Sequence, residues 1–538
     1  MRSLATYLVE ILEANGVDTI FGIPGVHTVD LYRGLENSRI RHVTPRHEQG
    51  AGFMADGYAR VTGKPGVCFI ITGPGMTNIV TAMGQAYGDS IPMLVISSVN
   101  PVGEMGSGRG HLHELKNQSA LVREVSAFSH TILDIHAVEP ALARAFSLFA
   151  AGRPRPVHIE IPVGLLNSDA SFMPAARRFA LPQPPAPCPD TGVQIASRLS
   201  AAMRPLIVAG GGAIGAASAI RSLAERLGAP VVMTVNARGI VPGDHPLAVP
   251  LTGDSAAVMK LLQESDATLA LGTEFGPTDF ADRLPASGRL PGWLARADLD
   301  AEQLMRGLRA DLPLLADARL TAEAVLEALP EGSPATAGAA IARAARHEVE
   351  TAMNPVLSAG LQMLDLLVQT RPDAIVVGDS TQPVYAGCTA FGAPRPASFF
   401  CSATGFGTLG YALPAAIGAA LGAPDRPVFG VIGDGGLQFT IAEMACATEA
   451  KTTIRLIVWN NRGYSEIKSY MINAGVPPVG VDIYTPDFEP IARGFGWRYR
   501  KVSSIGDFAT AIASPSIHNE VIEIDEAPFT ASVAGAGE

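Results

Sequence analysis

Cysteine is scarce and scattered in this chain of 538 residues. Its five copies, with no CxxC pair among them, are Cys68, Cys188, Cys388, Cys401 and Cys446. This spacing excludes a zinc cluster of the usual kind and offers no disulfide framework. Charged residues make up only 17% of the chain, the net charge is −11, and lysine and arginine form no dense run. We therefore expect no nucleic-acid partner.

The N-terminus lacks the unbroken apolar core that a signal peptide would need. Leu4, Leu8, Ile11 and Leu12 recur at helical spacing, but two glutamates interrupt them. We therefore expect the amphipathic first helix of a cytoplasmic protein. Residues 397–424 carry no charge, yet they contain five glycines and two prolines. This composition favours a buried loop and helix over a membrane span, so no membrane partner is expected.

Apolar residues, at 47% of the chain, are plentiful enough for several cores. Apolar strands such as GVCFIITG, PLIVAGGG and VFGVIGDGG alternate with helical segments, which predicts parallel sheets with crossover helices. Residues 181–190, with five prolines, and the segment 330–340 are interpreted as linkers. We predict an α/β protein of three doubly wound parallel-sheet domains at residues 1–175, 190–330 and 350–530.

The clearest site signal is the segment GDGG, which follows a predicted strand and precedes a helix. Asn460 and Asn461 end the next predicted strand. Because parallel strands deliver their carboxyl ends to one sheet edge, we expect the oxygens of Asp434 and Asn461 to lie close together. Such oxygens suit Mg²⁺ shared with a diphosphate. Gly435 and Gly436 leave room for backbone N–H groups to approach phosphate oxygens, although a purely structural turn is the alternative.

This segment resembles the diphosphate–magnesium motif of thiamine diphosphate-dependent enzymes. The resemblance implies that Asp434, Asn461 and the backbone carbonyl of Gly463 bind Mg²⁺. Thiamine chemistry also needs a carboxylic acid that hydrogen-bonds the pyrimidine ring of the cofactor. Glu48, in PRHEQGAGFMADGYAR, matches the catalytic glutamate of the family. A glutamate that merely caps a helix is the alternative for Glu48.

Other segments resemble the cofactor-binding parts of the same family. ITGPGMTN stands where the family has a glycine-rich loop near the pyrimidine. Leu409 matches the apolar residue that wedges between the two cofactor rings, with plain core packing as its alternative. The cofactor-binding residues that the resemblance implies are Gly73, Pro74, Asn78, Ser380, Thr381, Gly407, Leu409, Gly433, Gly435, Gly436, Tyr464 and Ile467.

A dinucleotide-type motif is not expected to bind its usual ligand. Gly210, Gly212 and Gly215 form GxGxxG after the strand PLIVA, but Asn236 stands where an acidic residue would be needed. The corresponding domain of acetolactate synthases, which have the same domain order, holds FAD. Here we interpret the glycines as packing residues and do not expect FAD.

The whole chain resembles the branch of acetolactate synthases and simple 2-oxo acid decarboxylases. GRGHLHELKNQ has neither the adjacent His–His pair of pyruvate-type decarboxylases nor the Phe-Gln-Glu run of acetolactate synthases. His111 and His113 flank a leucine instead, and in an extended loop both rings would face the same way. We therefore take both as catalytic candidates, with a solvated polar loop as the alternative.

Glu466 places a carboxylate where relatives bind a small apolar substrate, and we take it as a fourth catalytic candidate besides Glu48 and the histidines. A carboxylate there favours a cationic group such as a guanidinium. A surface ion pair with Lys468 or Lys451 is the alternative. FGIPGVHTVDLYRGL and LGTEFGPTDF, with the motifs above, resemble 5-guanidino-2-oxopentanoate (2-ketoarginine) decarboxylases. Glu466 or Glu114 would then bind the guanidinium of the substrate.

The resemblance implies a lyase of arginine catabolism that needs thiamine diphosphate and Mg²⁺ and forms 4-guanidinobutanal and CO₂. An acetolactate synthase-like carboligase acting on pyruvate is the alternative. The resemblance also implies a homodimer or homotetramer with the cofactor between subunits, so that Glu48 works with Asp434 of the partner subunit. The tail TASVAGAGE is rich in small residues, and we expect it to fray unless it closes over the site.

Overall fold

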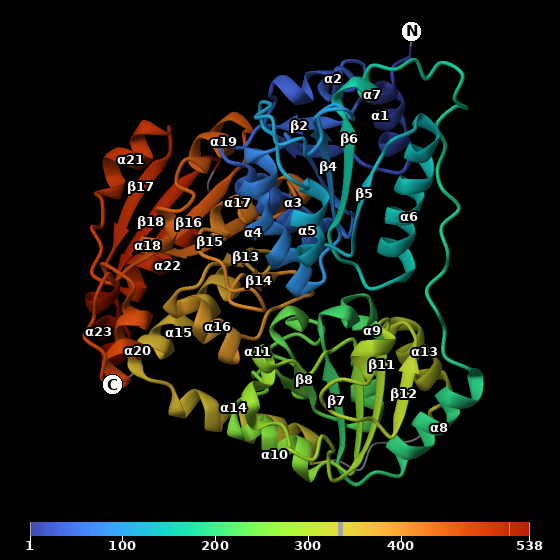
Figure 1. Cartoon of the computed structure of the whole chain (residues 1–538). Helices are drawn as coiled ribbons and strands as arrows, with labels where there is room; N and C mark the ends of the chain where they lie inside the picture. The colour runs from blue at the N-terminus through green and yellow to red at the C-terminus, as the bar shows by residue number, and fades with distance from the viewer. Residues whose placement is uncertain (1, 332–336, 516, 537–538) are drawn as a thin grey trace.

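Three six-stranded sheets, each flanked by helices, build the molecule (Figure 1). The computed structural model describes residues 2–331, 337–515 and 517–536. Neighbouring strands of all three sheets pair in parallel. The predicted fold class is therefore confirmed, while the exact domain limits 1–175, 190–330 and 350–530 stay a prediction.

The first sheet has the strand order β2-β1-β3-β4-β6-β5. Its strands are β1 (Thr19–Gly22), β2 (Arg41–Val43), β3 (Gly66–Ile70), β4 (Met93–Val99), β5 (Phe128–Thr131) and β6 (Val157–Pro162). Its helices are α1 (Leu4–Ala14), η1 (Val26–Thr28), α2 (Val29–Arg33), α3 (Glu48–Thr62), α4 (Pro74–Asp89), α5 (Gln118–Val122), η2 (Arg123–Val125), η3 (Ile135–Ala137), α6 (Val138–Ala151) and α7 (Val163–Leu166). The inner strands are buried along their whole length, as helices on both faces require.

The central sheet has a different order, β12-β11-β10-β7-β8-β9. Its strands are β7 (Pro205–Ala209), β8 (Val231–Met233), β9 (Ala248–Val249), β10 (Ala267–Leu271), β11 (Trp293–Asp298) and β12 (Leu312–Leu315). Its helices are α8 (Pro189–Ser200), η4 (Gly211–Ala216), α9 (Ala217–Leu227), η5 (Val235–Ala237), α10 (Ala256–Glu264), α11 (Pro277–Phe280), η6 (Ala281–Arg283), α12 (Ala301–Leu304) and α13 (Ala318–Ala328).

The third sheet repeats the order of the first, as β14-β13-β15-β16-β18-β17. Its strands are β13 (Ile375–Gly378), β14 (Phe399–Cys401), β15 (Val428–Gly433), β16 (Ile454–Asn460), β17 (Arg498–Val502) and β18 (Glu520–Asp525). The helices of this part are α14 (Gly338–Ala352), α15 (Pro355–Thr370), α16 (Gln382–Ala390), α17 (Ala412–Gly422), α18 (Asp434–Leu437), α19 (Glu443–Glu449), α20 (Ser465–Asn473), α21 (Phe488–Gly494), α22 (Ile505–Ala513) and α23 (Glu526–Ala536).

The first and third sheets are joined where α3 packs against α17. A Cβ atom on Gly57 would lie 2.0 Å from the carbonyl oxygen of Ala415, and one on Gly418 would lie 1.9 Å from that of Met54. The two helix backbones can approach this closely only because both positions lack a side chain. This crossing fixes how the two sheets lie relative to each other.

Several local predictions are confirmed. The first helix is α1, and its predicted apolar residues are all buried. Residues 397–424 form a short strand, a loop and the buried helix α17. Among the described residues no helix combines the length and the apolar character needed to cross a membrane.

The linker predictions hold only in part. Residues 181–188 are free of helix and strand and run along the edge of the molecule (Figure 1), but α8 begins at Pro189. Proline is tolerated there because the first helical position needs no backbone donor. In the second linker, residues 332–336 lie outside the described residues, and α14 begins at Gly338.

The C-terminal tail does not fray as far as residue 536, and its closing over the site stays a prediction. Residues up to 536 form helix α23. Phe529 is fully buried, and its ring packs edge-on against Trp459 with centroids 5.6 Å apart. Buried aromatic packing of this kind holds the helix in place despite its many small residues. Residues 537 and 538 lie outside the described residues.

Candidate cofactor and substrate site

The carboxyl ends of β15 and β16 meet at Asp434 and Asn461. The two strands pair directly, with Gly433 opposite Trp459. Burial is the main cause that raises the pKa of the Asp434 carboxyl, and the nearby backbone N–H of Asn461 acts in the opposite direction. Thr485 Oγ1 donates to Asp434 Oδ2 at 2.5 Å. The strands therefore bring residues 434 and 461 to one edge of the sheet, while the closeness of their side-chain oxygens stays a prediction.

One oxygen of the buried Asp434 carboxylate, Oδ1, has no hydrogen-bond donor among the described residues. A buried polar atom normally has a partner, and a hard divalent cation is one that this oxygen would suit. The described part of the chain has no cluster of three or more His, Cys, Asp or Glu side chains that could hold a metal ion by themselves. A set of one carboxylate, one amide and one backbone carbonyl does not need such a group, and these residues fit Mg²⁺.

Glycines line the space beside this carboxylate. A Cβ on Gly435 would lie 2.6 Å from the ring of Tyr464, and one on Gly433 would lie 3.3 Å from Thr381 Oγ1. Gly463 has a φ of 152°, a conformation that side chains rarely adopt. Four residues predicted to bind the diphosphate, Thr381, Gly433, Gly435 and Tyr464, therefore lie together around Asp434.

Asp379 connects the remaining predicted diphosphate residues. Its carboxylate accepts the backbone N–H groups of Ser380 at 2.9 Å, Gly410 at 3.3 Å and Ala412 at 3.0 Å. Burial raises the pKa of this carboxyl to about 6. A Cβ on Gly436 would lie 3.1 Å from the same carboxylate. Asp379 thus ties the turn at Ser380 to the loop that carries Gly407 and the half-buried Leu409.

The predicted pyrimidine residues converge on Glu48. Glu48 is the first residue of α3 and is buried. Asn78 Nδ2 donates to Glu48 Oε2 at 2.9 Å, and a Cβ on Gly75 would lie 3.2 Å from Oε1. The helix cap is supplied by His47, whose Nδ1 accepts the N–H of Gln49. The N-cap is therefore not Glu48, but an acid in the first turn of α3 still complements the helix dipole, so this role stays an alternative to the catalytic one.

Sequence reasoning missed a second buried glutamate, Glu443. Its carboxylate accepts the backbone N–H of Arg46 at 3.0 Å and that of His47 at 3.1 Å. A Cβ on Gly50 would collide with it at 2.2 Å. Burial raises the pKa of Glu443 to about 7. A side chain from the third part of the chain thus holds the turn that presents Glu48. The contact spans 397 positions, so no local motif reveals it.

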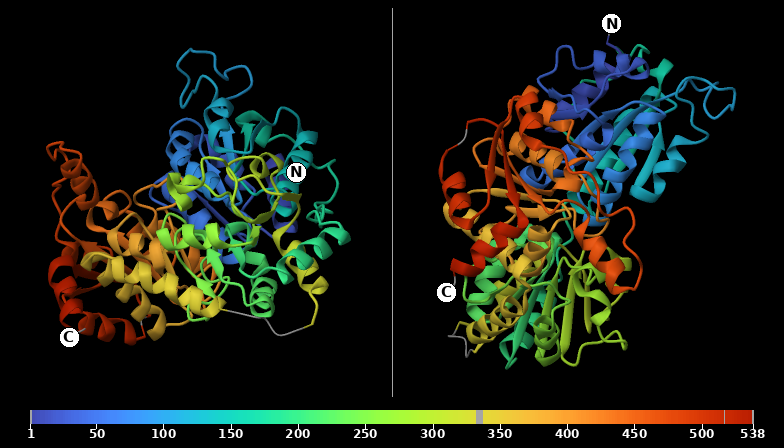
Figure 2. Two further views of the ribbon diagram at one scale, coloured as in Figure 1. Left: turned by 90° about the horizontal axis from the view of Figure 1, so that it is seen from below. Right: turned by 90° about the vertical axis from the view of Figure 1, so that its left-hand side faces the viewer.

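The loop between β4 and α5, which projects in light blue in Figure 2, carries the predicted histidines. The predicted extended conformation is wrong, because the N–H of Glu114 bonds the carbonyl of His111 in a turn and His113 has a φ of 60°. His111 pairs with Glu104 at 3.3 Å. The ring of His113 lies against His27 instead, with centroids 5.1 Å apart. The structure therefore separates the two histidines.

His27 is a further residue that sequence reasoning missed. Nδ1 of His27, Nδ1 of His113 and Nε2 of His111 are buried without a hydrogen-bond partner among the described residues. Burial is the main cause that lowers the pKa of His27, followed by the charge of His113. A Cβ on Gly73 would meet His113 at 2.7 Å. His113 and Glu48 therefore both lie against the loop of residues 73–75.

The two acidic candidates for substrate binding differ sharply. The Glu114 carboxylate accepts three backbone N–H groups of its own loop and the hydroxyl of Ser107. These bonds, led by that of Gly108, lower its pKa to about 2. Glu114 thus shapes the loop. Glu466 accepts one hydrogen bond, from Gln382 Nε2 at 2.6 Å.

The alternative of a lysine partner for Glu466 is wrong. Lys468 bonds Asp482 at 2.7 Å. Lys451 lies between α19 and β16, at the amino edge of the third sheet. On the same helix as Glu466, the side chain of Ile467 is 54% exposed, so in a single chain this predicted cofactor residue faces outward.

Two of the three glycines of the GxGxxG segment, Gly210 and Gly212, serve packing, whereas a Cβ on Gly215 would meet nothing within 4 Å. A Cβ on Gly210 would lie 2.1 Å from the carbonyl oxygen of Gly272. Asn236, where a nucleotide site would need an acid, instead accepts from Arg60 at 3.0 Å and donates to Asp89 at 3.0 Å. Arg60, which is buried, also pairs with Asp89 at 2.6 Å. The end of this strand unit therefore docks onto the first part of the chain.

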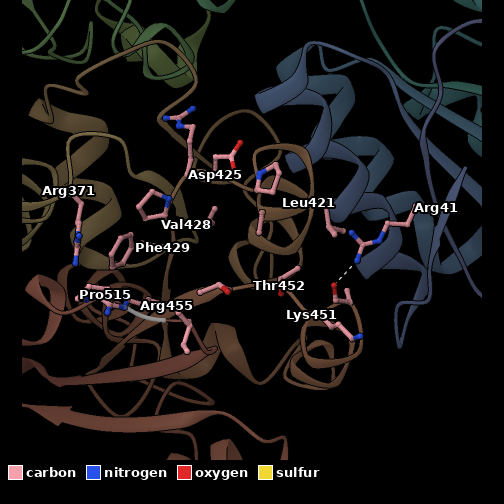
Figure 3. Close-up of a pocket in the computed structure, with 17 residues that line it drawn as sticks. Arg41, Arg371, Leu421, Asp425, Val428, Phe429, Lys451, Thr452, Arg455 and Pro515 are labelled. Carbon is pink, nitrogen blue, oxygen red and sulfur yellow. Dashed lines mark hydrogen bonds between the residues drawn. The ribbon is translucent and has the colours of Figure 1, made fainter. Parts of the chain in front are cut away.

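A cavity of about 490 Å³ lies at the opposite, amino edge of the third sheet (Figure 3). Its arginines donate to backbone carbonyls, as Arg41 does to Ala450 at 2.6 Å and Arg455 does to Ile512 at 3.1 Å. None of the predicted site residues lines it. We therefore assign these arginines to holding loop and helix ends.

Three family models match consecutive parts of the chain. They are described as the N-terminal TPP binding domain, the central domain and the C-terminal TPP binding domain of thiamine pyrophosphate enzymes. The matches cover residues 2–121, 193–329 and 379–524. The first and last contain the two groups of predicted cofactor residues.

Similar proteins cover nearly the whole chain. A probable 2-ketoarginine decarboxylase of Pseudomonas aeruginosa is 45% identical over 505 residues, which is 93% of this chain and 89% of that protein. The large subunit of acetolactate synthase isozyme 1 of Escherichia coli is 33% identical over 85% of this chain and 81% of its own length. An acetolactate synthase of Mycobacterium avium is 33% identical over 87% and 76%.

Proposed function

The chain belongs to the thiamine pyrophosphate enzyme family, and we propose that it decarboxylates 5-guanidino-2-oxopentanoate to 4-guanidinobutanal and CO₂. Its general activity is the thiamine diphosphate-dependent decarboxylation of a 2-oxo acid. The observation that carries the proposed substrate is Glu466, a carboxylate just beyond the proposed metal segment with a single amide donor, Gln382. The name of the Pseudomonas relative points to the same substrate.

When bound, thiamine diphosphate supplies the electron sink that loss of CO₂ from a 2-oxo acid needs. We propose that Asp434, Asn461 and the carbonyl of Gly463 hold Mg²⁺ and through it the diphosphate. Glu48, buried and bonded to Asn78, holds a proton at the pyrimidine end. Burial keeps water away from the carboxyl groups of Asp434 and Glu48, which strengthens the electrostatic interactions that they make with the cofactor and the metal.

The proposed substrate has a charge at each end, and the site offers a partner for each. Gln382 occupies Oε2 of Glu466, so Oε1 stays available to a guanidinium, which pairs well with a carboxylate. At the other end, the unpartnered nitrogens of His27 and His113 can donate to the 2-oxo acid group when they carry protons. His111, held by Glu104, then serves the loop.

We propose further that the site is completed in a homodimer or homotetramer. Val26 and Leu112, beside the histidines, are 74% and 60% exposed, and on α20 Ile467 and Tyr470 are 54% and 67% exposed. Exposed apolar side chains grouped near a site mark an interaction surface. Pairing of these two faces between copies would bring Glu48 to Asp434 of the partner subunit.

The test is an assay of the purified protein with thiamine diphosphate and Mg²⁺. We expect CO₂ and 4-guanidinobutanal from 5-guanidino-2-oxopentanoate and poor turnover of pyruvate. Glu466→Gln should raise KM for the guanidino acid about tenfold or more, the loss expected for a charge-assisted bond. Glu323→Gln, on α13 of the central part and paired with Arg319, is the control and should leave KM close to that of the wild type. Acetolactate formed from pyruvate, with the guanidino acid inert, would refute the proposed substrate and favour a carboligase.

A further inference from the structure

The start of α23 reaches the proposed metal site. Glu526, its first residue, follows β18 directly. Glu526 Oε2 accepts Trp459 Nε1 at 2.6 Å and Asn461 Nδ2 at 3.2 Å. Trp459 is fully buried and packs against Phe529 of the same helix. The carboxylate of Glu526 is therefore fixed by a buried indole on one side and contacts a predicted metal ligand on the other.

This contact decides which end of the Asn461 amide faces the site. An ionised carboxylate only accepts hydrogen bonds, so the NH₂ end of the amide must point to Glu526. The oxygen, which is the only end of an amide able to bind a cation, then points the other way. The backbone N–H of Asn461 meets the Asp434 carboxylate, whose Oδ1 has no partner among the described residues.

We propose that Glu526 is a positioning residue that orients the amide of Asn461 for Mg²⁺. The inference rests on the proposed metal role of Asp434 and Asn461. Partners that orient metal ligands typically change metal affinity 10- to 100-fold when they are removed. α23 thereby contributes to the cofactor site.

The neighbouring asparagine offers a matched case. Asn460 Nδ2 donates to Glu523 Oε1 at 2.8 Å, and Asn460 Oδ1 accepts the N–H of Arg462 at 3.1 Å. Both ends of this amide are therefore used within the protein. Glu523 also accepts the hydroxyl of Tyr499 at 2.7 Å. Glu523 and Glu526 each hold one asparagine and one aromatic side chain, but Asn461 Oδ1, unlike Asn460 Oδ1, accepts no hydrogen bond from the described residues.

The experiment compares Glu526→Ala, Glu526→Gln and the control Glu523→Ala in the full-length protein. Mg²⁺ is titrated by calorimetry in the presence of thiamine diphosphate, and thermal melting is followed without either. We expect Glu526→Ala to weaken Mg²⁺ binding about 10- to 100-fold. Glu526→Gln, whose amide oxygen accepts the same bonds, should recover most of the affinity. Glu523→Ala should lower the melting temperature and leave Mg²⁺ affinity within about threefold.

Two results would overturn the inference. One is wild-type Mg²⁺ affinity in folded Glu526→Ala, and the other is an equal loss in Glu523→Ala, because both would leave no special role for Glu526. If Glu526→Ala does not fold, an affinity of Glu526→Gln as weak as that of an Asn461→Ala variant would contradict the inference. Absence of Mg²⁺-dependent cofactor binding in the wild type would instead refute the proposed function, and this inference with it.

Discussion

The first and third sheets have the same strand order but different chemistry at their carboxyl edges. In the first, the loop after β3 lies against a buried acid, Glu48, and against His113, whose ring packs on His27. In the third, the ends of β15 and β16 offer oxygen ligands and glycines. The difference lies in a few residues just beyond the strands, where open α/β sheets bind ligands. In the proposed function, the same architecture thus serves once as a proton-handling half and once as a metal-binding half.

The largest expected effect separates the two halves. Glu48→Gln should keep cofactor and Mg²⁺ binding close to wild type and lower kcat about 10²- to 10⁴-fold, the usual contribution of a general acid or base. Asp434→Asn should instead weaken Mg²⁺-dependent cofactor binding. Calorimetry and steady-state kinetics on both variants check this. Equal loss of cofactor binding in both would contradict the division of roles.

A smaller effect, on stability, is expected from Glu443 of the third part, which holds the turn before Glu48 in the first part. The pKa of Glu443 rises from 4.5 to about 7 in the folded protein, so the folded state binds its proton more tightly. Its contribution to stability is fully present below pH 4.5 and is lost as the pH rises through about 7. Wild-type unfolding free energy should fall by about 2–3 kcal/mol over this range because of this group.

Urea denaturation at pH 4.5 and 7.5 measures the dependence on Glu443. Glu443→Gln should remove most of this decline, because a neutral side chain does not titrate. Glu449→Gln is the matched control, since Glu449 lies on the same helix, pairs with Arg46 and has a side chain that is 58% exposed. A decline in Glu443→Gln as steep as that of the wild type would show that other groups cause it.

The smallest expected effect concerns the crossing of α3 and α17. Gly418→Ala should destabilise the protein by about 1–3 kcal/mol, the usual cost of overpacking, because its methyl group would meet the Met54 carbonyl at 1.9 Å. Gly164→Ala is the control, since a Cβ there meets nothing within 4 Å. Melting temperatures measure both. Equal stability of the two variants would mean that the helices can separate at little cost.

Sequence patterns predicted the inner strands well and the edge strands poorly. β2, β5 and β17 lie at sheet edges and read RHV, FSHT and RYRKV. Edge strands are covered on fewer sides, so they need no apolar run and carry no clear signal. The helix at the tail was missed for the opposite reason, because a few side chains, among them the buried Phe529 and Val533, anchor a segment rich in small residues.

The predicted site residues share a local motif, and the missed ones do not. Asp434 of GDGG and Asn461 lie 27 positions apart on one strand–helix–strand unit. This spacing alone predicts that both lie at the same edge of the sheet. His27 meets His113, and Glu443 meets the turn before Glu48, across long stretches of chain. Such contacts depend on how sheets and loops pack, which a single sequence does not reveal. The turn at His113, with its positive φ, was missed as well, because a histidine in a sequence gives no sign of this conformation.

A single hydrogen-bond cluster around Arg60 joins all three parts of the molecule. Its guanidinium bonds Asp56 and Asp89 of the first part and Asn236 of the central part. Tyr411 of the third part donates to the same Asp56. Opening either junction removes a neutral partner, Asn236 or Tyr411, from this buried cluster of charges, and a buried polar group that loses a hydrogen-bond partner is unfavourable. The three sheets should therefore melt in one cooperative transition, and their separated pieces should not behave as independent folding units.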